Sequence, residues 1–285
     1  MRILKTKKND GHENNQRKPI SLVVERIDEI RNFLGNHKLA VFLDYDGTLT
    51  PITSSPSGAL LGDDMKAVLG RLSSLCPVAI ISGRDKDLLK TLVGLDQITY
   101  AGSHGLEIEG PQGSGLYHNV GTEFSVEVQC LAGRLAHSLL NIPGVLVERT
   151  AYTVAVHYRL TPPQFISKVE DLLQKVLVEF SGFRKTLGKM VFEIRPRIGW
   201  DKGRALMWVL DSISANDETR IPIYIGDDLT DEDAFHIIHD RGLGLLVSDN
   251  PKKTYASYML KDTCEVLWFL EWLECDLQRR LQLKR

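Results

Sequence analysis

Two kinds of hydrophobic pattern alternate along the chain. In one, several consecutive residues are apolar, as in strands that are buried on both faces of a sheet. In the other, apolar residues recur every three or four positions, which predicts amphipathic helices. The apolar stretches are 39–43, 78–81, 221–225 and 243–247, and the apolar helix faces span 23–34, 65–72 and 88–92. Short buried strands separated by such helices predict a parallel sheet with helices on both faces. The first helix is expected to begin at Ser21, a suitable N-cap, and to end at Gly35.

The pattern changes after about Gly105. Residues 153–158 alternate between apolar and more polar side chains, which is the period-two signature of a strand exposed on one face. The stretch 190–194 is similar, and Thr161 is a suitable N-cap for a helix that reaches Phe180. Half-exposed strands with helices beside them predict a small, separate α+β lobe.

The buried-strand pattern resumes at Trp200, so we expect the chain to leave one sheet, build a lobe and return. This organisation predicts an α/β protein: a doubly wound parallel-sheet (Rossmann-like) core with an inserted α+β cap domain. The predicted core comprises residues 21–105 and 197–285, and the predicted cap comprises residues 106–196. Residues 1–20 are expected to form a polar N-terminal tail.

Composition and charge exclude several classes of protein. Of the 285 residues, 43% are hydrophobic and 25% are charged, which argues against wholesale disorder. The 37 acidic and 35 basic side chains nearly balance, so the chain offers no overall attraction for nucleic acid or for an anionic membrane. Its longest apolar clusters are far shorter than the ~20 residues that cross a bilayer, and no secretory signal follows Met1. We expect a cytoplasmic protein with four free cysteines, Cys76, Cys130, Cys264 and Cys275.

The first candidate site follows the apolar stretch 39–43. Asp44 and Asp46 are separated by one residue, so both side chains can point the same way at the strand end, where open α/β sheets bind ligands. Two carboxylates at one place repel each other unless a cation or a shared proton lies between them. One of them could bind a metal and attack a substrate while the other transfers a proton. The alternative is a strand-end turn that caps the next helix, and this pair alone does not decide between the two.

Three further segments place polar groups at the same expected edge of the sheet. Ser82-Gly83-Arg84 follows the second apolar stretch, Lys202 lies at a helix start, and Asp227 and Asp228 follow the third stretch. A lysine at a helix start is unfavourable for the helix dipole unless an anion lies nearby. Carboxylate oxygens are the ligands that a hard divalent cation prefers. Taken one at a time, these residues could instead be helix caps, an acidic helix start and a solvated surface lysine.

Together the four segments resemble the haloacid dehalogenase superfamily of phosphatases and phosphomutases. The motifs are Asp44-x-Asp46-Gly-Thr, Ser82-Gly-Arg84, Lys202 and Gly226-Asp227-Asp228-x-x-Asp231. The resemblance implies that Asp44 is the catalytic nucleophile, that Asp46 is the acid and then the base, and that Lys202 is the third catalytic residue. It also implies that Ser82 and Lys202 bind phosphate and that Asp44, Asp46 and Asp227 hold Mg2+.

A narrower resemblance is to the trehalose-6-phosphate phosphatases. It rests on the segments 44–52, 102–107, 193–196 and 226–235. It implies a cap that closes over a disaccharide. The substrate-binding residues that it implies are Ser82, Gly83, Arg84, His104, Arg149, Lys189 and Glu193, and the cap residues Glu148, His157 and Arg159 also match polar positions of that family. Many relatives have a lysine where this chain has Arg149.

The implied activity is the Mg2+-dependent hydrolysis of trehalose 6-phosphate through an aspartyl phosphate. Phosphatases of mannosyl-3-phosphoglycerate or sucrose 6-phosphate would use the same core, and only the cap would differ. A catalytically silent sugar-phosphate sensor would be expected to lack one of the carboxylates, and a phosphomutase would keep the phosphoryl group on its product. We expect a monomer that binds a sugar phosphate and neither nucleic acid nor membrane. Association with a trehalose-phosphate synthase stays an open alternative.

Overall fold

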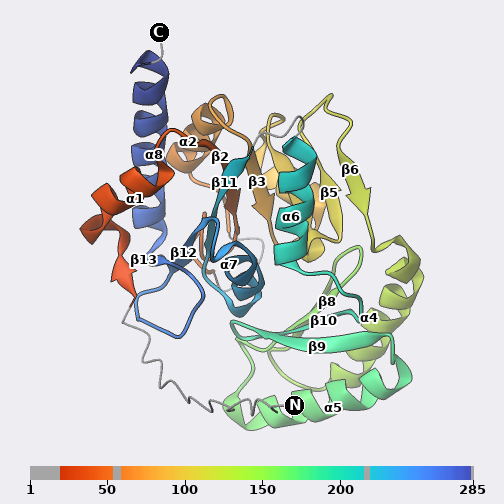
Figure 1. The fold of residues 1–285 in the computed structure, drawn as a ribbon. Coiled ribbons are helices and arrows are strands. Elements are labelled where there is room, and N and C mark those ends of the chain that lie inside the picture. The colour runs from red at the N-terminus through yellow and green to blue at the C-terminus, as the bar shows by residue number, and fades with distance from the viewer. Residues whose placement is uncertain (1–19, 54–58, 215–218, 284–285) are drawn as a thin grey trace, which may run out of the picture.

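A large, mostly parallel sheet organises the protein (Figure 1). The computed structural model describes residues 20–53, 59–214 and 219–283, so the predicted tail at 1–20 lies outside the described residues except for Ile20. In these ranges the larger sheet, called the core sheet below, has nine strands in the order β1-β13-β12-β11-β2-β3-β4-β5-β6. They are β1 (Ser21–Leu22), β2 (Lys38–Leu43), β3 (Val78–Ile81), β4 (Thr99–Gly102), β5 (Glu107–Glu109), β6 (Tyr117–Asn119), β11 (Arg220–Gly226), β12 (Leu243–Val247) and β13 (Tyr258–Leu260). Neighbouring strands are parallel from β1 to β4, and β5 and β6 add an antiparallel edge.

Alternate residues of each central strand enter two different hydrophobic clusters. In β2, Leu39 and Val41 pack with the helices on one face, whereas Ala40 and Phe42 pack with those on the other. The first face is covered by α1 (Ile27–Leu34), α2 (Asp63–Ser73), α3 (Lys86–Val93) and α8 (Thr263–Leu283), and the second by α6 (Lys202–Ile213) and α7 (Glu232–Ile238). Because both faces of the strand are buried, its sequence is apolar throughout.

A second, smaller sheet lies beside the core sheet and is called the cap sheet below (Figure 1). It is antiparallel, in the order β7-β8-β10-β9, with the strands β7 (Leu146–Arg149), β8 (Val154–His157), β9 (Phe183–Gly188) and β10 (Val191–Pro196). Helices α4 (Ser125–Leu139) and α5 (Ile166–Glu179) pack on one face against Val154, Val156, Phe192 and Ile194. The other face is turned toward the core sheet. The predicted fold class, a doubly wound core with an α+β cap, is confirmed.

The first helix begins later than its sequence pattern predicts. Ser21 and Leu22 form β1 and pair in parallel with Tyr258 and Met259, so they are not part of a helix. A short 3-10 turn follows, and α1 starts only at Ile27. The pairing with β13 satisfies backbone groups that a longer helix would have used, so the N-cap prediction for Ser21 is wrong.

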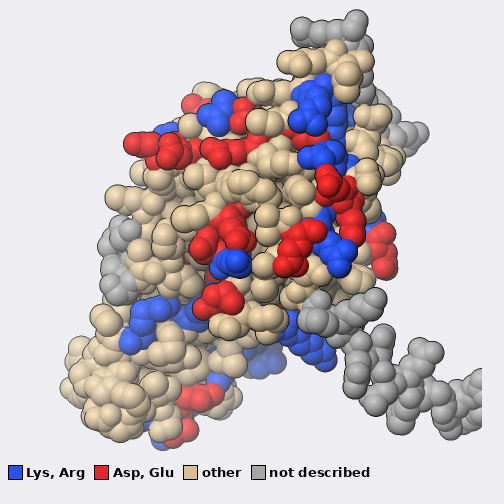
Figure 2. Space-filling view, turned by 90° about the vertical axis from the view of Figure 1, so that its left-hand side faces the viewer, with Lys and Arg blue, Asp and Glu red and all other residues tan. Residues whose placement is uncertain are grey.

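Charges of both signs are mixed on the face shown in Figure 2. On that face, lysine and arginine side chains alternate with aspartate and glutamate, and the residues drawn in colour form no continuous basic patch. Within the described ranges, every helix is too short or too polar to cross a lipid bilayer.

Candidate active site

Three strand ends of the core sheet meet at one edge and carry the first group of predicted residues. Strands β2, β3 and β11 are neighbours, with Leu43 paired to Ile80 and to Ile225, so their carboxyl ends coincide. Asp44, Ser82 and Asp227 each follow directly after one of these strands, and their exposed fractions are 5%, 1% and 2%, respectively. The fold thus buries two carboxylates close to each other and to a hydroxyl group.

Lys202 joins this group from the start of α6. Its Nζ donates to Asp44 Oδ1 at 2.6 Å and to Asp231 Oδ1 at 2.8 Å, and only 2% of the residue is exposed. The two carboxylates supply the anions that a lysine at a helix start requires. Burial raises the pKa of Asp44 above its ordinary value, and Lys202 opposes this rise. The single ammonium group therefore serves two buried acids at once.

Arg84 holds the side chain of Asp46 through two hydrogen bonds. The guanidinium donates through Nε and Nη2 to the two oxygens of Asp46, both at 2.6 Å, and lies 5.3 Å from the centre of the Tyr45 ring. Such a two-point contact fixes the position of both side chains. The structure therefore pairs Arg84, predicted to bind substrate, with the predicted acid and base.

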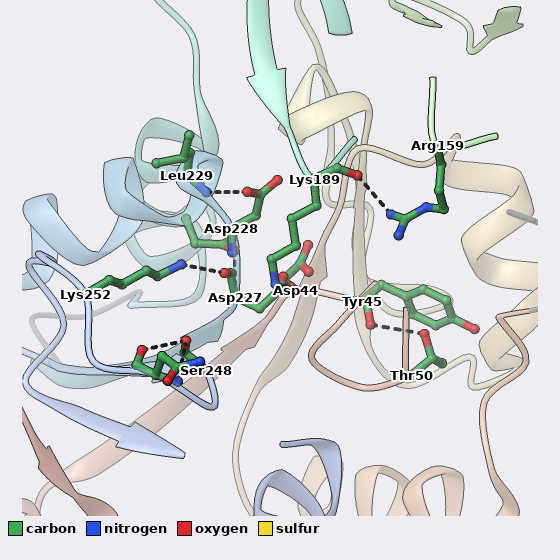
Figure 3. A network of polar contacts seen from close by, with 12 residues as sticks. Asp44, Tyr45, Thr50, Arg159, Lys189, Asp227, Asp228, Leu229, Ser248 and Lys252 are labelled. Atoms are coloured by element: carbon green, nitrogen blue, oxygen red, sulfur yellow. Dashed lines mark hydrogen bonds and ion pairs between the residues drawn. The ribbon is translucent and has the colours of Figure 1, made fainter. Parts of the chain in front are cut away.

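Asp227 is a buried carboxylate whose hydrogen bonding is incomplete among the described residues. Its Oδ1 is buried and has no hydrogen-bond partner among the described residues, whereas its Oδ2 accepts a hydrogen bond from Lys189 Nζ at 2.5 Å. Figure 3 shows Lys189 reaching from the turn between β9 and β10 to this carboxylate. Burial, together with Asp231, raises the pKa of Asp227 to about 6, and Lys189 acts against this rise. Oxygen atoms of Asp44, Asp227 and Asp231 lie within 4.8 Å of one another, which suits a small divalent cation.

The face of the cap sheet that points away from α4 and α5 forms the opposite wall of the site. Because side chains alternate along a strand, Glu148, His157 and Glu193 share this face. His157 Nε2 lies 2.9 Å from Glu148 Oε2, so these two residues form a polar pair on the wall. Arg149 follows Glu148 in the same strand and therefore points to the other face, where it is exposed.

His104 of the core connects to Glu193 of the cap sheet. His104 Nε2 lies 2.7 Å from Glu193 Oε2, and Gly83 lies so close that a Cβ there would be 3.0 Å from the imidazole ring. Burial lowers the pKa of His104, and the charge of Glu193 opposes this effect. Burial alone would raise the pKa of Glu193, but His104 and the positive charges of Arg195 and Lys202 lower it to about 2.

One cavity of about 210 Å³ collects these groups between the core sheet and the cap sheet. Every residue of the predicted site except Arg149 lines it. The predicted residues in its wall are Asp44, Asp46, Ser82, Gly83, Arg84, His104, Lys189, Glu193, Lys202 and Asp227. Apolar side chains at its outer part, Ile52, Leu146 and Leu160, were not predicted, because nothing in the sequence distinguishes them from other apolar residues. The combination of a buried nucleophilic carboxylate, a lysine and a cation-binding acid suits transfer of a phosphoryl group.

Comparisons with known proteins agree with this chemistry. The chain is 38% identical to trehalose-phosphate phosphatase B of Arabidopsis thaliana over 257 residues, which is 86% of this chain and 69% of the relative. It is 38% identical to probable trehalose-phosphate phosphatase 4 of Oryza sativa subsp. japonica over 258 residues, 87% of this chain and 70% of the relative. A crystal structure of a trehalose-6-phosphate phosphatase related protein superposes with a TM-score of 0.72 at 26% identity, covering 83% of this chain and 97% of that one.

Fold and site together define a phosphatase with the fold of haloacid dehalogenase-like hydrolases. The fold is shared with a haloacid dehalogenase-like hydrolase from Bacteroides thetaiotaomicron, with a TM-score of 0.59 at 17% identity over 83% of this chain and 99% of that one. Within this class the chain belongs to the trehalose-phosphatase family, whose model matches residues 42–264. It is accordingly an enzyme of the phosphoric monoester hydrolase class.

Proposed function

We propose that the protein hydrolyses trehalose 6-phosphate to trehalose and phosphate. The observation that carries this proposal is the placement of Asp44, Ser82 and Lys202 beneath a cavity whose opposite wall is the polar face of the cap sheet. The names of the relatives supply the sugar. On that wall, Glu148 and His157 offer hydrogen-bond partners for hydroxyl groups, and unmatched hydroxyls in a closed site are costly.

We propose that Mg2+ is the cofactor, held by the side chains of Asp44 and Asp227 and by the main-chain carbonyl of Asp46. The unpartnered Asp227 Oδ1 and the closeness of the carboxylate oxygens of Asp44 and Asp227, within 4.8 Å, support such a site. When bound there, Mg2+ would neutralise negative charge on the nucleophile and on the phosphoryl group, and it would align the two.

In the proposed first step, an Asp44 oxygen bonds to phosphorus as the bond between phosphorus and the sugar oxygen breaks. Lys202 and Ser82 bind the phosphoryl oxygens during this step. Asp46 gives its proton to the leaving sugar oxygen, so trehalose departs and an aspartyl phosphate remains. Arg84, which donates to both oxygens of Asp46, holds that side chain in position.

In the proposed second step, Asp46 takes a proton from a water molecule. The water oxygen bonds to phosphorus as the bond to Asp44 breaks. Phosphate leaves, Asp44 regains its free carboxylate and Asp46 regains its proton. The residues thus return to their starting state without any further reactant.

We further propose that residues 106–196 act as the cap over a core of residues 21–105 and 197–285. The cap selects the substrate, because its strands carry the groups that face the sugar. We propose that the protein acts as a monomer in the cytoplasm, where a reducing environment suits its free cysteines. Size-exclusion chromatography with light scattering tests the monomer, alone and with a trehalose-phosphate synthase added.

A panel of sugar phosphates, assayed for phosphate release with and without Mg2+, tests the function. We expect trehalose 6-phosphate to give the dominant signal and removal of the metal with a chelator to abolish it. Dominant phosphate release from mannosyl-3-phosphoglycerate or sucrose 6-phosphate would make that compound the substrate in place of trehalose 6-phosphate. Retention of the phosphoryl group on a product would indicate a mutase. Absence of release from every member would favour a sensor.

Asp44→Asn tests the nucleophile. The amide cannot attack phosphorus, and we expect at least a ~10³-fold loss of kcat because the covalent route is closed. The measurement is phosphate release alongside circular dichroism, which should show a folded variant. Appreciable turnover by Asp44→Asn would refute the assignment.

A further inference from the structure

A buried tyrosine lies directly behind the phosphate-binding lysine. Tyr224 is on β11, is 0% exposed and does not line the cavity. Its hydroxyl donates to Asp231 Oδ1 at 2.6 Å, and its ring packs edge-on against Phe235, with the ring centres 5.5 Å apart. A buried tyrosine hydroxyl needs a partner, and here the partner is a carboxylate that also holds Lys202.

The acceptor positions of Asp231 are fully used. Its Oδ1 accepts from Tyr224 and from Lys202, and its Oδ2 accepts from the backbone N–H groups of Asp227 and Asp228, each at 2.9 Å. A carboxylate has about four acceptor positions, so none is left for a metal. The side chain of Asp231 is therefore held in place by these bonds, and it in turn holds Lys202. Asp231 is not available as a metal ligand, although it lies close to the two carboxylates proposed as ligands.

Lys202 donates hydrogen bonds to both Asp231 and the proposed nucleophile, Asp44. Its ammonium has three N–H donors, and in the described part of the chain two of them are engaged by Asp231 and Asp44. The third is left for a ligand in the cavity, which Lys202 lines. How far the ammonium group extends toward that ligand depends on how strongly Asp231 attracts it.

We propose that Tyr224 is a positioning residue for phosphate recognition, acting through Asp231 on Lys202. Its hydroxyl satisfies part of the negative charge of Asp231 and so leaves Lys202 free to contact Asp44 and a phosphoryl oxygen. Without the hydroxyl, Lys202 is the only side-chain donor to Asp231 among the described residues, and it is drawn away from the cavity. Burial and the charge of Asp231 raise the pKa of Tyr224 well above its ordinary value, so the group stays a donor.

Tyr224→Phe removes the hydroxyl and keeps the ring. We expect the Kd of orthovanadate and of inorganic phosphate, measured by calorimetry with Mg2+, to rise about five- to tenfold, since a hydrogen bond to a charged group is lost. The affinity for trehalose should not change, because the cap residues that face the sugar are not involved. Tyr100→Phe is the matched control: Tyr100 is 2% exposed, and within the described part of the chain its hydroxyl bonds only to the backbone of Leu95, at 2.8 and 3.2 Å.

A double-mutant cycle with Lys202→Met separates positioning from a general structural effect. Once the ammonium group is absent, Tyr224→Phe should not weaken phosphate binding further, so the two effects should be strongly non-additive. Unchanged phosphate affinity in Tyr224→Phe overturns the inference, as does equal weakening of phosphate and trehalose, or additivity in the cycle. The inference rests on the proposed function, but the vanadate and phosphate measurements do not depend on the sugar. A wild-type protein that fails to bind trehalose would count against the proposed substrate alone.

Discussion

At Gly47 the backbone passes so close to Asp227 that no side chain fits between them. Its φ of +87° lies in the region that favours glycine, and a Cβ there would lie 2.1 Å from Asp227 Oδ2. His104 adopts a positive φ of 60° although it is not a glycine. Such a conformation costs about 1–3 kcal/mol and persists where the surroundings fix it. The contact with Glu193 and the burial of His104 provide that support.

His104→Gln is expected to flatten the dependence of stability on pH. Burial lowers the pKa of His104, and Arg195 and Lys202 add to this effect against the opposing charge of Glu193. As the pH falls below about 6.5, the unfolded chain binds a proton at this residue more readily than the folded protein does. The wild type therefore loses up to about 1.4 kcal/mol of stability per pH unit from this group, and glutamine removes that loss.

Urea unfolding between about pH 5 and 7 measures this difference. Glu193, with a pKa of about 2, stays ionised across the window and does not contribute to the slope. His137→Gln, at an exposed position of α4, controls for the loss of an imidazole elsewhere in the protein. Parallel curves for His104→Gln and the wild type would contradict the prediction.

At the scale of helices and strands, burial on both faces decided what the sequence could predict. Strands β2, β3, β11 and β12 are recognisable because both faces are covered, which leaves a continuous apolar run. Strands β1, β5 and β6 have only two or three residues, too few for any period to show. Their positions follow from partners that are distant in sequence.

Two predictions for the cap were wrong for other reasons, namely strand register and a 3-10 turn. Arg149 was predicted to face the sugar, but the register of β7 gives that face to Leu146 and Glu148. A shift of one residue exchanges the faces of a strand, and one sequence does not fix the register. Thr161, predicted as an N-cap, has a buried hydroxyl with no partner in the described ranges, because a 3-10 turn precedes α5.

Gly203→Ala is expected to destabilise the protein although alanine favours helices. In α6, a Cβ at this position would lie 2.5 Å from the carbonyl oxygen of Asp233, so α6 and α7 would have to separate. We expect a loss of about 1–3 kcal/mol from this overpacking, more than the gain of about 1 kcal/mol in helix propensity. Because Lys202 precedes this residue, kcat should fall as well.

Gly133→Ala supplies the matched control in α4. A Cβ there meets nothing within 4 Å, so only the propensity term remains and stability should rise by about 0.5–1 kcal/mol. Urea unfolding of both variants measures the change in the free energy of unfolding, which should be negative for Gly203→Ala and positive for Gly133→Ala. Stabilisation by Gly203→Ala would mean that the two helices yield easily at their contact.

At the scale of the whole molecule, the site exists only where the cap sheet meets the core sheet. Ser103 Oγ donates to Thr150 Oγ1 at 3.0 Å, and the backbone N–H of Ala151 donates to Asp85 Oδ2 at 3.3 Å. These contacts lie beside the cavity. The first joins two neutral hydroxyl groups, and in the second only the carboxylate carries a charge. Lys189 adds a contact in which the cap reaches a proposed metal ligand, Asp227.

Lys189→Met is expected to tighten the binding of Mg2+ in the absence of substrate. Lys189 lies at a two-residue turn, where Arg159 donates to its carbonyl oxygen, and its ammonium group pairs with Asp227 (Figure 3). A cation bound to the same carboxylate would be repelled by that positive charge. Since 44% of the Lys189 side chain is exposed, solvent screens the effect, and we expect Kd to fall only about three- to tenfold.

Calorimetry with Mg2+ measures this change without relying on turnover, and Lys252→Met controls for charge alone. Lys252 also lies beside Asp227, but it donates to the backbone carbonyl at 2.9 Å and leaves the carboxylate oxygens untouched. Its removal should tighten Mg2+ binding less than Lys189→Met does. Weaker binding in Lys189→Met would mean that the lysine orients Asp227 for the cation. Stronger binding would mean that Lys189 of the cap competes with Mg2+ for Asp227. In the absence of metal, the ammonium group of Lys189 would then supply the positive charge beside this carboxylate.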